Sequence, residues 1–173
     1  MKNLKIAIQK SGRLNEKSVQ LLKNCGLDFE NYKSSLITIV SNFNLEILFL
    51  RDDDIPDYVE QGIADLGIVG ENVIDESQAN VDYLQRLGFG KCTLKLAVPK
   101  DANYTDIKDL DGKSIATCYP NILSKFLQEK QITAEIHPIS GSVEIAPGLG
   151  LSEAICDIVS TGGTLKNNGL KPF

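Results

Sequence analysis

The sequence predicts an α/β fold with largely parallel sheets, arranged as two lobes. Three observations lead to this prediction. Short apolar runs alternate with helix-like segments along the chain, glycine and proline mark the boundaries, and two distant stretches share one strand–glycine–helix pattern. Strands that alternate with helices are typical of βαβ units with parallel strands. At 173 residues, the chain is long enough for one ordinary domain or two small lobes.

In the first half of the chain, each expected strand leads into a helix. Residues 4–9 (LKIAIQ) alternate like a strand, and residues 15–25 have apolar positions at helical spacing before Gly26. Residues 45–51 (LEILFLR) form a second strand. The acids and proline of RDDDIP then predict the start of a helix. The other elements expected here are the end of that helix at about residue 61, a strand at 65–69 and a short helix at 71–76.

The second half repeats the alternation with shorter elements. Strands are expected where the sequence is apolar and β-branched, and helices where proline or small polar residues precede a helical pattern. The expected strands are 94–99, 113–117, 134–139 and 155–159. The expected helical segments are 107–110, 121–130, the start of 142–149 and a short helix near Ser152.

An internal similarity supports two lobes. GIADLGIVGENV (62–73) resembles GLSEAICDIVSTGGTL (150–165), and in each an acid on an apolar strand lies five residues before a glycine. Either the similarity reflects how common strand–glycine–helix units are, or two similar lobes each present such a turn to a shared cleft. The crossing is expected near LGFGKCTLKLAVP (87–99), which gives lobe I as 1–91 and lobe II as 92–173.

Composition excludes several classes of function. A net charge of −5 disfavours a nucleic-acid surface, and no apolar run is long enough to span a membrane. The N-terminus lacks the pattern of a signal peptide, so a cytoplasmic protein is expected. The cysteines have no CxxC spacing and are expected to be buried small hydrophobic residues in a reducing compartment. With one histidine, His137, a catalytic triad or multi-histidine metal site is not expected.

The stretch DIVSTGGTL (157–165) predicts a phosphate site. A loop of small residues at a helix start exposes backbone N–H groups, and glycines let a phosphate approach them. Asp157, on the preceding strand, could accept hydrogen bonds from sugar hydroxyls, so that the stretch would suit a ribose 5-phosphate. The alternative is a structural turn in which these residues only cap a helix. The Walker lysine is missing.

Two further groups of residues are candidates for binding. Lys10 and Arg13 in QKSGRL, together with Arg51, follow expected strands and could neutralise phosphates, or could simply form a solvated rim. Tyr119 in CYPN and Glu144 in GSVEIAP could stack on and orient a purine. Equally, the tyrosine could pack in the core and the acid could be an ordinary first-turn helix charge.

Together, these segments resemble the ATP phosphoribosyltransferase family. The resemblance covers nearly the whole chain and keeps the family's order of motifs, and QKSGRL and RDDDIP resemble the long form that carries its own regulatory domain. The matching segments are QKSGRL, RDDDIP, DLGIVGENV, LGFGKC, IATCYPN, GSVEIAP and EAICDIVSTGGTLKNNGL.

The resemblance implies a fold, a reaction and roles for residues. The fold would be periplasmic-binding-protein-like (type II), with mixed, largely parallel sheets and a cleft between two lobes. The reaction would join N1 of the adenine of ATP to C1 of phosphoribosyl pyrophosphate (PRPP) and release pyrophosphate, with Mg²⁺ as cofactor and no assigned protein ligand for it. The implied catalytic residues are Lys10, Arg13 and Arg51. The implied PRPP-binding residues are Asp157, Ser160, Thr161, Gly162, Gly163, Thr164 and Leu165, and the implied ATP-binding residues are Glu71, Tyr119, Ser142 and Glu144.

The resemblance also carries expectations about partners. Family members form homo-oligomers, dimers that assemble into hexamers, and extend beyond the point where this sequence stops. The chain is therefore expected to be C-terminally truncated and to lack the histidine feedback site. Two alternatives are a type I phosphoribosyltransferase acting on another base, and a non-catalytic nucleotide- or solute-binding module. The first usually has two adjacent acids, whereas here Cys156 precedes Asp157.

Overall fold

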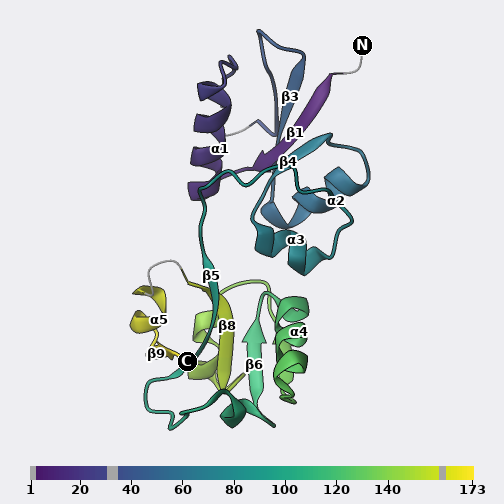
Figure 1. Ribbon diagram of the computed structural model, residues 1–173. Coiled ribbons are helices and arrows are strands. Elements are labelled where there is room, and N and C mark those ends of the chain that lie inside the picture. Colours follow the sequence, from purple (N-terminus) through teal and green to yellow (C-terminus); the bar gives the residue numbers. More distant parts are fainter. Residues whose placement is uncertain (1–2, 31–34, 160–162) are drawn as a thin grey trace. The chain divides into compact units, whose positions relative to one another are not determined.

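The computed structural model describes residues 3–30, 35–159 and 163–173, which form two compact units. Unit 1 is Met1–Gly90 and unit 2 is Lys91–Phe173 (Figure 1). The sequence-based boundary between 91 and 92 lies one residue from this division. The expected cleft between the lobes stays a prediction.

Unit 1 is built on a four-stranded sheet with the order β2-β3-β1-β4. β1 pairs in parallel with β3 and β4, while β2 runs antiparallel to β3. The expected helix at 15–25 begins earlier, at Gly12, and β2 was not predicted. The elements are β1 (Leu4–Gln9), α1 (Gly12–Asn24), β2 (Ile37–Ile39), β3 (Leu45–Leu50), a 3₁₀ turn (Asp52–Asp54), α2 (Ile55–Glu60), β4 (Leu66–Ile68) and α3 (Glu71–Ser77).

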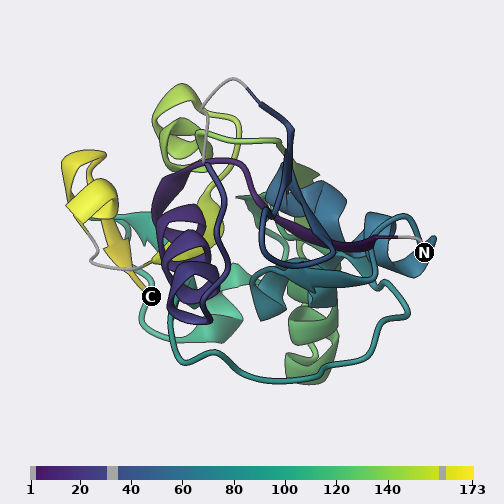
Figure 2. The ribbon, with the colours of Figure 1, turned by 90° about the horizontal axis from the view of Figure 1, so that it is seen from above.

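The alternation of side chains along β1 divides the core of unit 1 between two sheet faces. Ile6 and Ile8 pack with Leu22 of α1 on one face, whereas Ala7 packs with Ile55 of α2 on the other. Figure 2 shows α1 and α2 on opposite sides of this sheet. Because both faces are covered, β1 and β3 are apolar almost throughout, as expected of parallel strands between helices.

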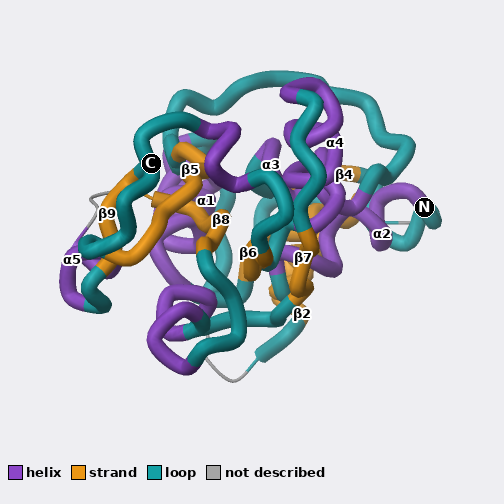
Figure 3. The backbone as a smooth tube through the Cα atoms, turned by 90° about the horizontal axis from the view of Figure 1, so that it is seen from below, coloured by secondary structure: helices purple, strands orange, loops and turns teal. Residues whose placement is uncertain are grey.

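Unit 2 contains a five-stranded mixed sheet with the order β7-β6-β8-β5-β9, seen in Figure 3. β6 pairs in parallel with β7 and β8, while β5 is antiparallel to β8 and β9. The elements are β5 (Thr93–Pro99), a 3₁₀ turn (Ile107–Leu110), β6 (Ser114–Thr117), α4 (Pro120–Lys130), β7 (Glu135–Pro138), two 3₁₀ turns (Val143–Ile145 and Pro147–Leu149), β8 (Ala154–Val159), α5 (Gly163–Asn167) and β9 (Leu170–Pro172).

Two predictions about local structure and environment are wrong. The helix expected near Ser152 is absent because the chain already runs beside β6 there: the Glu153 amide donates to the Ser114 carbonyl at 3.0 Å. The expected burial of all four cysteines fails for Cys25, at the end of α1, and for Cys92, just before β5, which are both exposed. None of the described helices is long and apolar enough to cross a bilayer.

Ile8 tests the burial in unit 1. Its side chain is 0% exposed between β1 and α1. Ile8→Ala removes buried methyl groups and leaves a cavity, so it should lower the free energy of unfolding by about 2–5 kcal/mol. Urea denaturation followed by circular dichroism measures this loss. The matched control is Ile39→Ala, on a side chain that is 67% exposed, for which about 0.5 kcal/mol or less is expected. Equal losses for the two variants would contradict the assigned core.

Candidate functional site

In unit 1, parallel pairing brings several predicted residues to one edge of the sheet. Gln9 pairs with Leu50 at the ends of β1 and β3, and β4 runs parallel beside them. The next residues are therefore Lys10 and Arg51, with Glu71 beginning α3 after β4. The Lys10 amide donates to the Leu50 carbonyl at 2.7 Å, which continues the ladder to this edge. The carboxyl ends of strands are where ligands bind in open α/β sheets.

Arg51 is held in a two-pronged ion pair that sequence reasoning missed. Its Nε and Nη2 lie 3.1 and 2.8 Å from the two carboxylate oxygens of Asp53. The hydrogen bond to Asp53 and its charge raise the pKa of Arg51 above its usual value. Both side chains are mostly exposed, at 73% and 58%, so the pair stabilises the fold little. An incoming phosphate must compete with Asp53 for the guanidinium.

The QKSGRL turn has the backbone that its glycine requires. Gly12 has φ 88°, a conformation that a residue with a Cβ rarely adopts. The Asn15 side chain donates to the Gln9 carbonyl at 2.6 Å and ties the first turn of α1 to the end of β1. Lys10 and Arg13 are exposed on either side of this turn. The turn therefore places both cations at the sheet edge that Arg51 shares.

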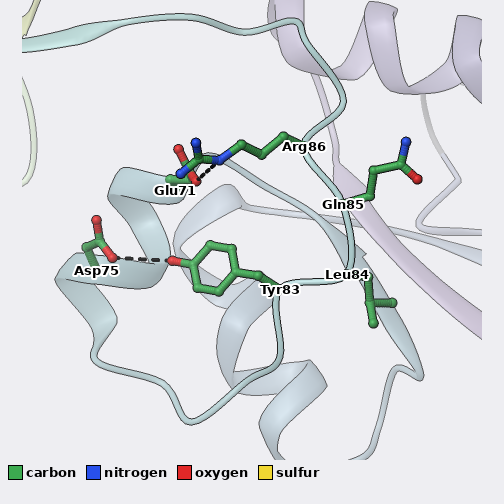
Figure 4. A pocket seen from close by; sticks show the side chains of 6 residues that line it. All are labelled: Glu71, Asp75, Tyr83, Leu84, Gln85 and Arg86. Atoms are coloured by element: carbon green, nitrogen blue, oxygen red, sulfur yellow. Dashed lines mark hydrogen bonds and ion pairs between the residues drawn. The ribbon is translucent and has the colours of Figure 1, made fainter.

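Glu71 lies in a pocket of about 500 Å³ that also involves residues not predicted from the sequence (Figure 4). Its Oε1 lies 2.9 Å from Nε of Arg86, and the Tyr83 hydroxyl donates to Asp75 at 3.3 Å. Burial, followed by the charge of Asp75, raises the pKa of Tyr83. A ligand that uses Glu71 must share it with Arg86, whose side chain is 86% exposed.

In unit 2, the pairing of β6 with β8 brings Cys118 and Tyr119 to the edge where Asp157 lies. Thr117 pairs with Cys156, so the residues that follow them, Cys118 and Asp157, lie side by side. The Tyr119 amide donates to the hydroxyl of buried Thr117 at 2.9 Å, which fixes the turn into α4. Cys118 was not predicted as a site residue, although a residue directly after a buried strand is a signal that could have identified it.

Asp157 is a half-buried acid with a shifted titration. Burial is the main reason its pKa lies above the ordinary value, and the charge of Glu144 adds to the shift. A 2.7 Å hydrogen bond from the Ile158 amide to Oδ1 opposes it. The pKa of Cys118 is raised by burial and by the charges of Asp157 and Glu144. Asp157, Glu144 and Cys118 therefore form one cluster, in which the acids favour ligands that donate hydrogen bonds.

The loop after β7 places Glu144 in this cluster. Val143 is 1% exposed and packs with Ala97, Ala116 and Ile155, which anchors the loop against the sheet. Ser142 precedes it with φ 52°, a left-handed conformation uncommon for a residue other than glycine. Such backbone strain often occurs at functional sites. Ser142 is exposed and Glu144 is half-buried beside Asp157.

The structure describes only part of the predicted phosphate loop. Ser160, Thr161 and Gly162 lie outside the described residues. Gly163 begins α5, and Thr164 is exposed on it. Leu165 is 4% exposed and packs with Ile155 and Leu170, so its side chain belongs to the core. Leu165 could therefore contact a ligand through its backbone but not through its side chain.

The described residues form no metal cluster, and the second pocket is apolar. Among the described residues, no group of three or more His, Cys, Asp or Glu side chains is placed to hold a metal ion. An apolar pocket of about 500 Å³ lies between the sheet of unit 2 and α4, and Leu96, Phe126 and Phe173 contribute to its lining. It lacks the polar cluster of Asp157 and Glu144, so it is a weaker candidate for a polar substrate.

Comparisons with known proteins agree on one family. A family model described as "HisG: ATP phosphoribosyltransferase" matches residues 51–173. The ATP phosphoribosyltransferases of Cytophaga hutchinsonii and Bacteroides fragilis are 58% and 51% identical to the chain over 168 residues. These matches cover 97% of the chain, which spans only 59% of the length of each relative.

A solved structure of an ATP phosphoribosyltransferase is also similar to the chain, and the solved structures confirm the predicted fold class. The "ATP phosphoribosyl transferase (HisG:HisZ) complex from Thermotoga maritima" matches with a TM-score of 0.82 and 35% identity, over 98% of this chain and 81% of that chain. The periplasmic aliphatic sulphonate binding protein SsuA from Escherichia coli matches with a TM-score of 0.61 at 18% identity, over 99% and 56%. The second likeness concerns the fold alone, which is periplasmic-binding-protein-like.

The raised pKa of Asp157 predicts a stability effect that depends on pH. When folding raises the pKa of an acid, the folded state loses stability as the pH rises from the unfolded pKa, ordinarily 3.8, through the raised one. Asp157→Asn removes this cost while its amide oxygen can still accept from Ile158. The variant should therefore melt at a higher temperature than the parent chain at pH 7, with a smaller difference at pH 3.

Thermal melts followed by circular dichroism at the two pH values measure this effect. The control is Asp101→Asn, which changes the net charge equally at an exposed position after β5. A lower melting temperature for Asp157→Asn at pH 7, relative to this control, would show that the carboxylate stabilises the fold instead.

Proposed function

Because the chain belongs to the ATP phosphoribosyltransferase family, we propose that it is the catalytic region of that enzyme. The reaction transfers the phosphoribosyl group of PRPP to N1 of the adenine of ATP, with release of pyrophosphate, and begins histidine biosynthesis. The observation that carries this proposal is the position of Asp157, which is half-buried near the end of β8 and three residues before Ser160, where the STGGTL segment begins.

The unit 2 edge suits the ribose of PRPP. Asp157 offers carboxylate oxygens that accept hydrogen bonds, as vicinal sugar hydroxyls require. Ser160, Thr161 and Gly162, outside the described residues, and Gly163, Thr164 and the Leu165 backbone would bind the 5-phosphate. In this arrangement the Asp157 carboxylate would face the sugar and the backbone N–H groups would face the phosphate, which avoids repulsion between like charges.

The other predicted residues would bind nucleotide and phosphates. Lys10, Arg13 and Arg51 would bind phosphate oxygens of ATP or PRPP, with Arg51 exchanging Asp53 for the substrate. Tyr119, Ser142 and Glu144 of unit 2 would bind the ATP nucleotide. Glu71 of unit 1 is likewise proposed to bind ATP. C1 of the ribose gains positive charge as pyrophosphate leaves, so catalysis requires orientation and stabilisation of charge rather than a protein nucleophile.

Mg²⁺ is the proposed cofactor, and the described residues do not form a site that would hold it alone. The described residues contain no cluster of three candidate ligands, and Asp157 and Glu144 together make only a pair of acids. The ion would therefore be held mainly by the pyrophosphate oxygens, as is common for Mg²⁺ in phosphate chemistry.

Membership of the family also supports a proposal about the oligomeric state of the protein. We propose a cytoplasmic homo-oligomer. One solved relative is described as a HisG:HisZ complex, so a hetero-oligomer with a partner subunit is the alternative. Sedimentation of the purified protein alone distinguishes the two.

Product formation is the direct test of the proposed activity. A protein that contains this chain, mixed with ATP, PRPP and Mg²⁺, should form a new ultraviolet-absorbing product as N1 of the adenine is substituted. Asp157→Asn, which is expected to stay folded, serves as the matched control and should lower the rate. Binding of both substrates by folded protein without turnover would favour a non-catalytic binding module.

Asp157 also predicts a difference between the two substrates. If its carboxylate binds the PRPP ribose, Asp157→Asn should weaken PRPP binding by about ten- to a hundredfold, as expected for a hydrogen bond to a charged group. Binding of ATP should change less than threefold. Isothermal titration calorimetry of each ligand measures both constants. Equal losses for PRPP and ATP would contradict the assignment of Asp157 to the ribose.

A further inference from the structure

The antiparallel strand β5 brings an unassigned cation beside Asp157. Because β5 and β8 run in opposite directions, the start of β5 lies against the end of β8. In this register Lys95 is the direct cross-strand partner of Asp157, and Thr93 is the partner of Val159. Figure 1 shows β5 and β8 side by side in unit 2. Directly opposed residues of an antiparallel pair have Cβ atoms about 4.5–5.5 Å apart.

Side-chain alternation places Lys95 on the same face of the sheet as Asp157. Leu94, Leu96 and Val98 belong to the core on the α4 side. Ala97 packs with Ile155 and Val143 in the core on the other side. Since successive side chains on a strand point to opposite faces, Lys95 shares the face of Ala97, and Asp157 shares that of Ile155. Lys95 is therefore next to Asp157 on the face to which Val143 anchors Glu144.

The ammonium group of Lys95 is available to a ligand. The side chain is exposed, and among the described residues no carboxylate oxygen lies within 4.0 Å of its nitrogen. Three other lysines of unit 2 are engaged: Lys100 and Lys171 donate to backbone carbonyls, and Lys113 pairs with Glu153.

We propose that Lys95 binds a phosphate group of the substrate beside the ribose that Asp157 holds. A sugar phosphate presents hydroxyl donors and an anion a few ångströms apart, and the Asp157–Lys95 pair presents the complementary acceptor and cation. This inference rests on the proposed function in taking PRPP as the substrate. It adds a residue from the amino end of a strand, where the carboxyl-end rule for parallel sheets would not place a ligand.

The phosphate could be the 5-phosphate or the pyrophosphate of PRPP. Both present the same oxygen acceptors to an ammonium group. Ribose 5-phosphate carries only the first, and inorganic pyrophosphate reproduces only the second. Titration with each compound therefore identifies which group Lys95 binds.

Lys95→Met tests the proposal because it removes the charge and keeps an extended side chain. Calorimetry should show PRPP binding weakened by about ten- to a hundredfold, the range for a lost hydrogen bond between charged groups. Either ribose 5-phosphate or pyrophosphate should show a matching loss, and adenosine binding should not change. Lys95→Arg should retain most of the affinity for PRPP. Added salt should weaken PRPP binding by the parent chain more than PRPP binding by Lys95→Met.

Lys125→Met is the matched control. Lys125 is exposed on α4, on the opposite face of the same sheet, and its substitution changes the net charge equally. If PRPP binds the parent chain and Lys95→Met equally well, or if both methionine variants lose the same affinity, the role of Lys95 is overturned while the proposed function stands. If the folded parent chain binds no PRPP, the proposed function and this inference both fail.

Discussion

The two-sided pairing of β8 is the constraint on which the site in unit 2 depends. β8 has parallel β6 on one side and antiparallel β5 on the other. The parallel neighbour brings Cys118 and the turn into α4 to the edge where β8 ends. The antiparallel neighbour brings the start of a strand, with Thr93 and Lys95, to the same edge. One edge therefore combines acids, a half-buried aromatic residue and a cation, although these residues come from distant parts of the sequence.

The site residues of the two units are held by different physical means. Arg51 and Glu71 in unit 1 form exposed ion pairs with Asp53 and Arg86, which water screens and which a charged ligand can replace. Asp157 in unit 2 is instead partly removed from water, and its raised pKa shows that the fold bears a cost to keep the carboxylate there. Such a cost is expected of a residue retained for binding rather than for stability.

The local sequence pattern was sufficient to predict the strands that end at the site. It was insufficient to predict which strands pair with them and which side chains contact the site residues. Alternation and glycine stops predicted β1, β3 and β8, and hence the positions of Lys10, Arg51 and Asp157. Lys95 was missed because the direction of β5 depends on long-range pairing, and Asp53 and Arg86 because ion pairs depend on side-chain geometry. The prediction of a helix near Ser152 was wrong because the Glu153 amide hydrogen-bonds to β6. The prediction that Cys25 and Cys92 are buried was wrong because both lie outside the strands and are exposed.

We propose that the sugar phosphate binds at the edge formed by β5, β6 and β8. Mapping of PRPP onto the isotope-labelled chain by backbone amide chemical shifts tests this claim most directly. We expect the largest changes at residues 157–165, at Lys95 and at Cys118, with little change along α4. Changes confined to α4, including Phe126, or no change at saturating PRPP, would contradict it.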